Sequence, residues 1–324
     1  MNGDASGTSR RAFLGRAAGA AAVVAGAGVG AGAIAQNASA AAKPHRTYTA
    51  GHFALELGGL PCGFMAGLDG GQRDLAVDLD PVGSDNVQRK HIAGVKYEDF
   101  TLQVGSGMGK PMYQWIKDSF DKGYVRKNGS IVSADFNYRE KRNTSMSQAF
   151  ISSVTIPALD GASKDPAYLA VSLTPGKLTQ SPPSGQPVQA ARSKAWLQSN
   201  FVFELDGLDT SRVASIDSFT WKCGVAADGS QVLEVSDIAV SFPKQDLSSW
   251  RQWYDGLAGG ANDERRGALT LVGAHNGAVI TFGLGNLGLY RLSRDPAAPG
   301  RRVKAEMYCE EMRFHASGGG WTLN

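Results

Sequence analysis

The sequence predicts a mainly β protein with short helices, built as two tandem small antiparallel β-barrel or sandwich units that contain one α-helix each. Short runs in which apolar and polar residues alternate are bounded by glycine-rich turns, as expected for the strands of such folds. In each half of the chain, one strand is followed by a turn and a short amphipathic helix. This order of elements recurs, which indicates an internal duplication.

The stretch Val95–Gly123 shows the pattern most clearly. Phe100, Leu102 and Val104 alternate with polar residues, which is the period of a half-buried strand. A turn with three glycines follows, and Pro111 suits the first turn of a helix, where its missing N–H costs nothing. The glycine that closes the stretch suits the end of that helix. The predicted apolar stripe of the helix consists of Met112, Trp115, Ile116 and Phe120.

The stretch Leu233–Gly260 repeats this pattern. Ile238, Val240 and Phe242 form the second alternating strand. Asp246 is the predicted N-cap of the second helix. The apolar stripe of this helix consists of Leu247, Trp250, Trp253, Tyr254 and Leu257.

The two copies also agree in their spacing. The number of residues between Phe100 and Ile238 equals the number between Trp115 and Trp253. We call this common distance the repeat offset. One offset that relates both a strand and a helix is not expected by chance, which strengthens the prediction of a duplication.

Further strands mark both ends of each predicted unit. Phe53–Leu60 and Phe201–Leu208 share the pattern F-x-x-E-L-x-G-L, and the alternating strands Leu169–Leu173 and Val303–Cys309 close the two units. Between the units lies Thr174–Ala190, whose prolines, glycines and serines predict a linker without strand or helix. The predicted domains are unit 1 at residues 41–175, the linker at residues 176–199 and unit 2 at residues 200–324.

Unit 1 also contains a polar stretch, Ala76–Lys90, that is rich in turn residues such as Asp80-Pro81 and Asp85-Asn86. These residues predict a long exposed hairpin or loop. The stretch has no evident core to pack against. We therefore expect it to contact the next chain or ring of an assembly.

The first forty residues are typical of a targeting segment. Ser9–Leu14 contains an arginine pair before Phe-Leu and resembles a twin-arginine export motif; a weakly apolar run, Ala17–Ala35, and a small-residue cleavage site, Ala38–Ala40, follow. The alternative is a membrane anchor, although alanine and glycine make a poor membrane-spanning helix. We expect export to the periplasm, the cell surface or the extracellular space, with no stable membrane anchor after cleavage. The alternative location is a phage-like particle.

Charge and cysteine content exclude several classes of partner. The net charge of +3 falls to about +1 when residues 1–40 are removed, because these contain three arginines and one aspartate. No basic field remains to bind nucleic acid or an anionic membrane. Cys62, Cys223 and Cys309 are odd in number and do not occupy equivalent positions in the two repeats. We therefore expect buried or free thiols rather than a disulfide framework.

No catalytic, cofactor-binding or metal site is predicted, and we expect neither a cofactor nor enzymatic activity. The histidines lack zinc-ligand spacing, and no G-x-S-x-G motif occurs. Gly105–Lys110 has the composition of a phosphate-binding loop but not its spacing, so it is interpreted as a flexible turn. The acidic pairs Glu310-Glu311 and Asp78-Asp80 are interpreted as solvated faces, because no calcium-loop spacing accompanies them.

The order of elements resembles that of the tail tube proteins of contractile phages, which are related to the haemolysin-coregulated tube protein of type VI secretion. The resemblance rests on the opening strand Phe53–Leu60, on Gly94-Val95-Lys96, and on the strand, glycine turn and tryptophan-containing helix of residues 100–120. It covers most of residues 47–175 and, more weakly, residues 200–316. The resemblance implies small β-barrels that form hexameric rings, which stack into a hollow tube.

Two features depart from the family pattern. Tube subunits are usually single domains and cytoplasmic, whereas this chain is predicted to contain two units and an export signal. Two units per chain imply a trimer that forms a pseudo-hexameric ring. The main functional hypothesis is a structural protein that self-assembles into rings and stacked tubes, with sheath-like or baseplate-like proteins as further partners. The alternative is an exported β-rich binding module for a cell-surface or cell-wall ligand.

Replacing both Arg10 and Arg11 by lysine is expected to retain the precursor inside the cell, because the arginine pair is the feature that a twin-arginine route recognises. The measurement is the exported fraction after cell fractionation. An exported fraction equal to that of the unaltered chain would contradict the twin-arginine interpretation.

Overall fold

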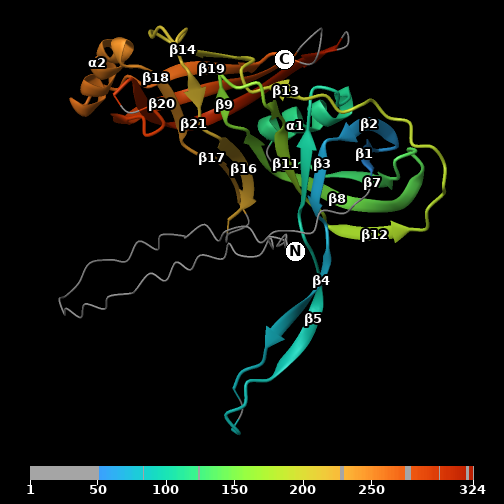
Figure 1. Cartoon of the computed structure of the whole chain (residues 1–324). Coiled ribbons are helices and arrows are strands. Elements are labelled where there is room, and N and C mark those ends of the chain that lie inside the picture. Colours follow the sequence, from blue (N-terminus) through green and yellow to red (C-terminus); the bar gives the residue numbers. More distant parts are fainter. Residues whose placement is uncertain are drawn as a thin grey trace, which may run out of the picture. The chain divides into compact units, whose positions relative to one another are not determined.

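The described residues of the first half of the chain lie mostly in strands (Figure 1). The computed structural model describes residues 51–82, 84–122, 125–226, 230–273, 279–298, 300–318 and 321–323. The predicted targeting segment, residues 1–40, lies outside the described residues. The elements of the first half are β1 (His52–Leu57), β2 (Leu60–Met65), β3 (Gly67–Gly70), β4 (Arg73–Leu79), β5 (Lys90–Tyr97), β6 (Phe100–Val104), α1 (Lys110–Lys122), β7 (Lys127–Ala134), β8 (Glu140–Ile156), β9 (Leu159–Asp160), β10 (Pro166–Ala167), β11 (Leu169–Thr174) and β12 (Lys177–Ser181).

The second half has the same character, and the prediction of a mainly β chain with short helices is confirmed. Its elements are β13 (Trp196–Leu197), β14 (Phe201–Leu205), β15 (Ser215–Ile216), β16 (Phe219–Val225), β17 (Gln231–Val235), β18 (Ile238–Pro243), the 3₁₀ turn η1 (Lys244–Asp246), α2 (Leu247–Ala258), β19 (Arg265–Leu271), β20 (Val279–Arg294), β21 (Arg302–Gly318) and β22 (Trp321–Leu323).

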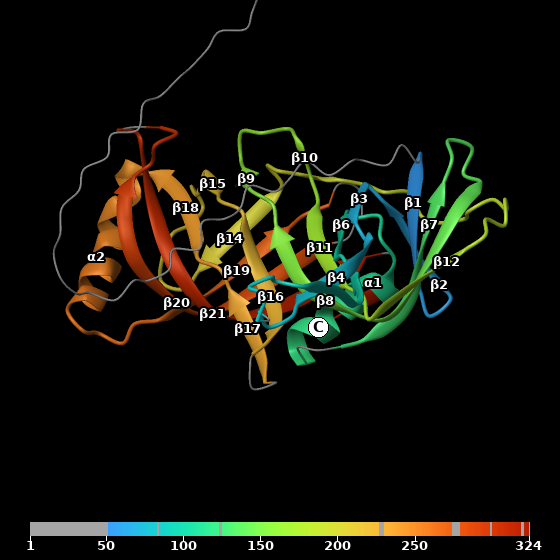
Figure 2. The same ribbon diagram turned by 90° about the horizontal axis from the view of Figure 1, so that it is seen from below.

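Most strands belong to two antiparallel sheets. The larger sheet has the order β2-β1-β7-β8-β11-β6-β3, with β12 and β16 also paired with β8, and β17 paired with β16. The other sheet has the order β14-β19-β20-β21-β18-β15-β9, with β22 paired with β21. The pairs β10–β13 and β4–β5 lie outside both sheets. Each half therefore contributes strands to the sheet of the other half, as Figure 2 shows for β16, which lies between β8 and β17.

The periodic patterns of the sequence correspond to buried faces. The alternation that begins at Phe100 is that of β6, in which every second side chain is buried. Helix α1 begins at Lys110 with Pro111 in its first turn, and its predicted end at Gly123 lies outside the described residues. In the described part of the chain, neither helix has the length and apolarity needed to cross a lipid bilayer. The side chains that are fully or nearly fully buried include Met112, Trp115, Ile116 and Phe120 of α1, and Trp250 and Trp253 of α2.

The predicted N-cap of α2 is correct in position, but the side-chain capping hydrogen bond expected of it is wrong. Asp246 occupies the N-cap position but makes no side-chain capping hydrogen bond. The preceding 3₁₀ turn holds Asp246 at φ −91° and ψ 2°, outside the extended conformation typical of a capping residue. Its carboxylate instead accepts a hydrogen bond of 3.0 Å from the guanidinium of Arg212.

The prediction that Thr174–Ala190 contains no strand is also wrong. Lys177–Ser181 forms β12, which pairs with β8. The prolines of this stretch flank the strand, so they do not remove a donor from its ladder. Further along, Val188 N–H donates to Tyr138 O over 2.7 Å, which holds the rest of the stretch against the first sheet. The segment between the halves is packed rather than free.

The two halves pair their strands in the same register. Ile131 faces Thr144 in β7–β8, and Leu269 faces Phe282 in β19–β20, so the repeat offset relates both strands of the first pair to those of the second. Both ladders also shift register at the same place, just before Gly129 in one half and just before Gly267 in the other. These coincidences support the predicted duplication.

A glycine occupies the same close contact in each half. A Cβ on Gly129 of β7 would lie 2.4 Å from the carbonyl oxygen of Glu56 in β1. A Cβ on Gly267 of β19 would lie 2.7 Å from the carbonyl oxygen of Glu204 in β14. Both distances are too short for any residue with a Cβ. Glycine is therefore required where β7 and β19 pair with the opening strands of their halves.

The halves nevertheless share one hydrophobic core. Phe120 of α1 stacks on Trp221 of β16 with ring centroids 4.3 Å apart, and the ring of Tyr113 in α1 lies 6.5 Å from that of Phe314 in β21. Most buried apolar residues of both sheets form one continuous cluster, and Ala54, Phe64 and Val132 form a small second one. The first helix is therefore covered by strands of the second half.

The tryptophan of each helix makes the same anchoring contact. The indole N–H of Trp115 donates to Val125 O over 2.9 Å, and that of Trp253 donates to Asp263 O over 2.8 Å. In both halves the acceptor lies ten residues after the tryptophan. Each bond fixes the chain that leaves the helix toward the next strand.

Truncation of either tryptophan, Trp115→Ala or Trp253→Ala, is expected to lower the free energy of unfolding by about 3–5 kcal/mol, because each removes a large buried ring. The measurement is equilibrium denaturation. Trp115→Phe and Trp253→Phe serve as controls that keep most of the ring volume and lose the hydrogen bond, at a smaller cost of about 1 kcal/mol plus a packing term. A loss well below about 1 kcal/mol for the alanine variants would contradict the burial of these side chains.

Candidate assembly surfaces

The residues considered for chemistry in the sequence lie apart on the surface. Glu310 accepts a hydrogen bond from Asn286, and both Glu310 and Glu311 are exposed. Asp80 lies 2.9 Å from His91, in an exposed pair. Within the described residues, no three His, Cys, Asp or Glu side chains are grouped so as to hold a metal ion. The acidic pairs are thus solvated, as the sequence indicated.

The glycine-rich turn before α1 is a packed contact, and its interpretation as a flexible turn is wrong. Ser106 N–H donates to Lys194 O over 2.7 Å. A Cβ on Gly105 would lie 2.0 Å from that same oxygen, and a Cβ on Gly107 would lie 2.0 Å from the oxygen of Arg192. Because these glycines have no side chain, they leave room for the backbone of the segment that joins the two halves.

The three cysteines are buried thiols, in agreement with the expectation from their number and positions. Burial raises the pKa of Cys62 to about 12 and that of Cys309 to about 11. Because the thiolate is the reactive form of cysteine, both side chains are chemically inert near neutral pH.

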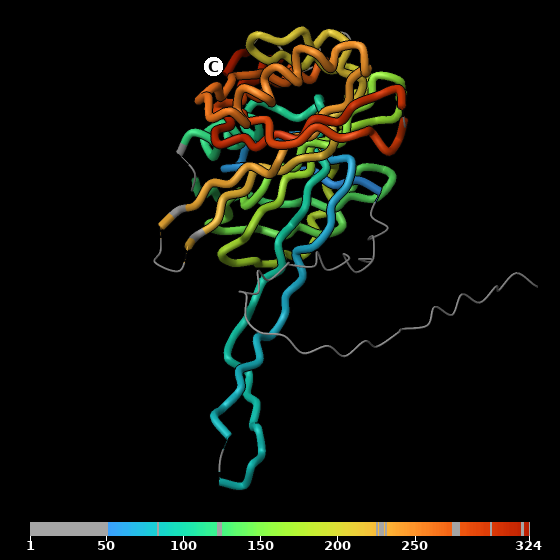
Figure 3. The backbone as a smooth tube through the Cα atoms, turned by 90° about the vertical axis from the view of Figure 1, so that its left-hand side faces the viewer, coloured from blue at the N-terminus to red at the C-terminus, as the bar shows by residue number. Residues whose placement is uncertain are grey.

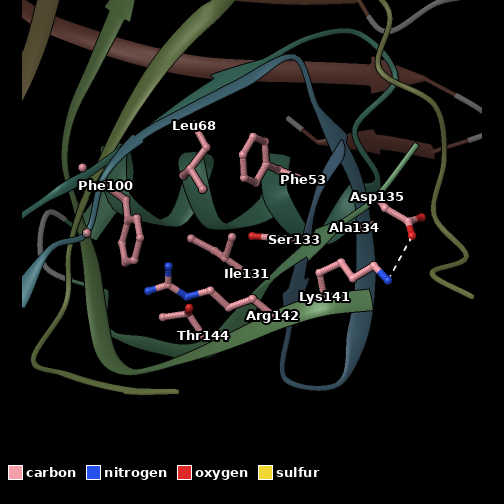
Figure 4. Close-up of a pocket in the computed structure, with 12 residues that line it drawn as sticks. Phe53, Leu68, Phe100, Ile131, Ser133, Ala134, Asp135, Lys141, Arg142 and Thr144 are labelled. Atoms are coloured by element: carbon pink, nitrogen blue, oxygen red, sulfur yellow. Dashed lines mark ion pairs between the residues drawn. The ribbon is translucent and has the colours of Figure 1, made fainter. Parts of the chain in front are cut away.

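A cavity of about 360 Å³ opens in the first half, between β1, β3, β6, β7 and β8 (Figure 4). The rings of Phe53 and Phe100 and the side chain of Leu68 form its apolar wall. Lys141 lies at its edge, 3.3 Å from the carboxylate of Asp135. The remaining lining residues are Gly70, Gly71, Ile131, Ser133, Ala134, Arg142 and Thr144.

The two halves differ at one position that lines this cavity, Gly71. Leu68 faces Leu102 in β3–β6, as Ile216 faces Val240 in β15–β18. Gly71 follows Leu68 at the same spacing at which Phe219 follows Ile216, so Gly71 corresponds to Phe219, which is 1% exposed. A Cβ on Gly71 would lie 1.8 Å from the ring of Phe100, so this ring packs directly against the glycine.

The hairpin β4–β5, which we call the arm, extends away from both sheets (Figures 1 and 3). It confirms the exposed hairpin predicted at Ala76–Lys90. Several apolar side chains are exposed among its charged ones, and isolated two-stranded ribbons are marginal in water. The apolar side chains of the arm that are between 43% and 62% exposed are Leu75, Val77, Leu79, Val82, Val87, Ile92 and Val95.

The second half contains a hairpin at the equivalent place, but that hairpin is docked. Strand β16 of the β16–β17 hairpin pairs with the end of β8, where Trp221 faces Val154. The hydroxyls of Thr155 and Thr220 lie 2.9 Å apart across the pair, and Ser218 Oγ donates to the carbonyl of the last residue of β8 over 2.8 Å. We call this contact the internal joint.

Of these surfaces, the arm was predicted from the sequence as a contact with the next chain or ring, whereas the cavity and the internal joint were not. The signal that was present is the unequal character of the two hairpins: residues 76–90 are polar and long, whereas the second copy is short. The joint itself has no local signature, because it combines strands that lie far apart along the chain.

The sequence was compared with protein-family models and with curated proteins, and no match was found in either comparison.

Proposed function

We propose that this protein is a structural subunit that assembles head-to-tail with further copies of itself into rings, and that the rings stack into a tube like the inner tube of a phage tail or contractile injection system. The observation that supports the proposal is the difference between the two hairpins. The hairpin of the second half docks on the first half, while the arm of the first half has no strand partner besides itself in the described chain.

An exposed apolar ribbon is a liability for a monomer. Its strands present unpaired N–H and C=O groups, which attract another strand. A surface that attracts a different surface of an identical chain gives a head-to-tail contact, and such contacts close into rings when the rotation between subunits permits. With two similar halves per chain, three chains would form a ring with pseudo-sixfold symmetry.

The proposal includes export. The arginine pair at Arg10-Arg11 supports assembly outside the cytoplasm, in the periplasm, at the cell surface or beyond it. Sheath-like or baseplate-like proteins are proposed as further partners on the outer surface and at the ends of a tube. The small net charge of the chain gives no support for a nucleic-acid partner.

A second candidate function is an exported binding module for a cell-surface or cell-wall ligand. The cavity beside Phe53 and Phe100 favours it, because about 360 Å³ is within the range of small-molecule sites and its wall combines apolar rings with polar groups. A monomeric protein that co-sediments with purified cell walls, and loses this when Leu68→Trp fills the cavity, would establish the second candidate in place of the first.

The purified exported protein is expected to run in light-scattering chromatography at the mass of three chains or a multiple of it, and to show rings or tubes by negative-stain electron microscopy. Removal of the arm tip, residues 82–87, is expected to shorten or abolish tubes while rings remain. The physical reason is that the tip exposes Val82 and Val87 without a core beneath them.

The matched control keeps the hairpin and removes only its apolar tip. Val82→Ser with Val87→Ser should reproduce the loss of stacking, and circular dichroism should show that both variants remain folded. A protein that stays monomeric at high concentration would refute self-assembly. A tip deletion without effect on tube length would refute the role of the tip in stacking.

A further inference from the structure

The internal joint links two halves with the same strand registers, so each of its strands has a counterpart elsewhere in the chain. The counterpart of β16 is β4, the first strand of the arm. Arg73 faces Tyr97 in β4–β5, as Trp221 faces Val235 in β16–β17. The second strands of these hairpins, β5 and β17, are related by the repeat offset, which also relates the two helices.

Hydrogen bonds beside these pairs support the correspondence. Glu98 N–H donates to Gln72 O over 2.9 Å, and Ser236 N–H donates to Thr220 O over 2.9 Å. Gln72 in the first half therefore occupies the place of Thr220 in the second. Residues 71–74, at the start of the arm, correspond to the four residues of the second half that pair with β8.

The counterpart of the end of β8 is the end of β20. The β7–β8 and β19–β20 ladders end at Ala149 and Leu287, which are again related by the repeat offset. Beyond that point, residues 153–156 of β8 pair with β16. The corresponding residues 291–294 of β20 pair with β21 on one side, and no described strand pairs with them on the other side.

We infer that a second copy of the chain docks residues 71–74 on residues 291–294 of β20, antiparallel and in the register of the internal joint. The inference rests on the proposed self-assembly and specifies its contact. The register places Asp74 opposite Arg291. Each chain then contains the joint twice, once internally and once with its neighbour.

The charges of the two surfaces agree with this register. The side chain of Arg291 is 63% exposed and lies 3.6 Å from Glu306 on the neighbouring strand, so it remains accessible to a second carboxylate. Asp74 is exposed at the base of the arm. Opposite charges at facing positions of paired strands stabilise the pairing.

A second pair of opposite charges follows from the position of the helix. In the internal joint, Trp221 stacks on Phe120 of α1, and Lys117 lines the same cleft. In the contact between chains, Arg73 takes the place of Trp221, and Asp255 of α2 takes the place of Lys117. Arg73 and Asp255 are both exposed. An arginine thus approaches an aspartate where the internal joint has a buried ring.

The contact between chains is therefore more polar than the internal joint. Exposed ion pairs are screened by salt, whereas a buried aromatic stack is not, so assembly should weaken as ionic strength rises while the fold remains intact. The second internal contact, β9 on β15, has no counterpart in the described chain, because Asp295 to Ala298 form a turn closed by the Ala298 N–H and Asp295 O.

The test is a charge exchange. Asp74→Arg and Arg291→Asp are each expected to raise the chain concentration needed for assembly at least about tenfold, and the double variant is expected to restore it, because facing charges contribute strongly to such contacts. The control is Arg313→Asp, which changes the same charge at a side chain 74% exposed on β21. Circular dichroism and thermal melting verify that each variant is folded.

A crosslink tests the register independently of charge. The register places Gln72 opposite Ser293, as Thr220 faces Thr155. A chain with Gln72→Cys, mixed with a chain with Ser293→Cys, is expected to give a disulfide-linked heterodimer on mild oxidation, since the native thiols are buried. The control mixture replaces the second variant by Ser248→Cys, on the exposed first turn of α2.

The outcomes separate this contact from the proposed function. Restoration by the double variant together with the specific heterodimer supports the contact. Rings that form without the heterodimer and without sensitivity to either charge reversal would overturn the contact and leave self-assembly standing. A chain that is monomeric at every concentration would overturn both.

Discussion

The pairing of β16 with β8 is the interaction on which the rest of the structure depends, because it connects the backbone of one half to that of the other. It also places Trp221 on Phe120, which covers α1. A buried strand edge without a partner would lose its hydrogen bonds where no water can replace them. Neither half could therefore keep its edge and its helix covered alone, and the chain forms one core in spite of its repeated plan.

The positions that the two halves share and the positions at which they differ serve different purposes in this structure. The halves share residues that the backbone geometry requires. These are the glycines that lie against carbonyl oxygens of the opening strands, and the tryptophans that hydrogen-bond the chain after each helix. The halves differ where Gly71 stands for Phe219 and where one hairpin is long and exposed while the other is docked. The differences occur at the surfaces to which we assign assembly, as expected if one joint is internal and its copy is between chains.

Predictions from local sequence patterns were correct where the pattern alone decides which side chains are buried. The alternation from Phe100 and the stripe around Trp115 were predicted correctly, because burial of one face imposes a period on strand and helix. Asp246 was predicted correctly as the N-cap residue of α2, but its side chain makes no capping hydrogen bond, since the carboxylate binds Arg212, which is distant in the chain. The strand at Lys177–Ser181 was missed, because flanking prolines conceal a short run that is stabilised only by β8.

The sequence by itself determined the strand and helix periods, the common offset of the two copies, the buried stripes and the exposed character of the arm. Only the tertiary structure decided which half each strand joins, why the glycines before α1 are needed, and where a cavity opens beside Phe100. The physical reason is that the period of apolar residues indicates which side chains are buried, but it does not indicate which residues cover them. The partner across a sheet edge or a core is chosen by contacts between residues far apart in the chain, and these leave no local pattern.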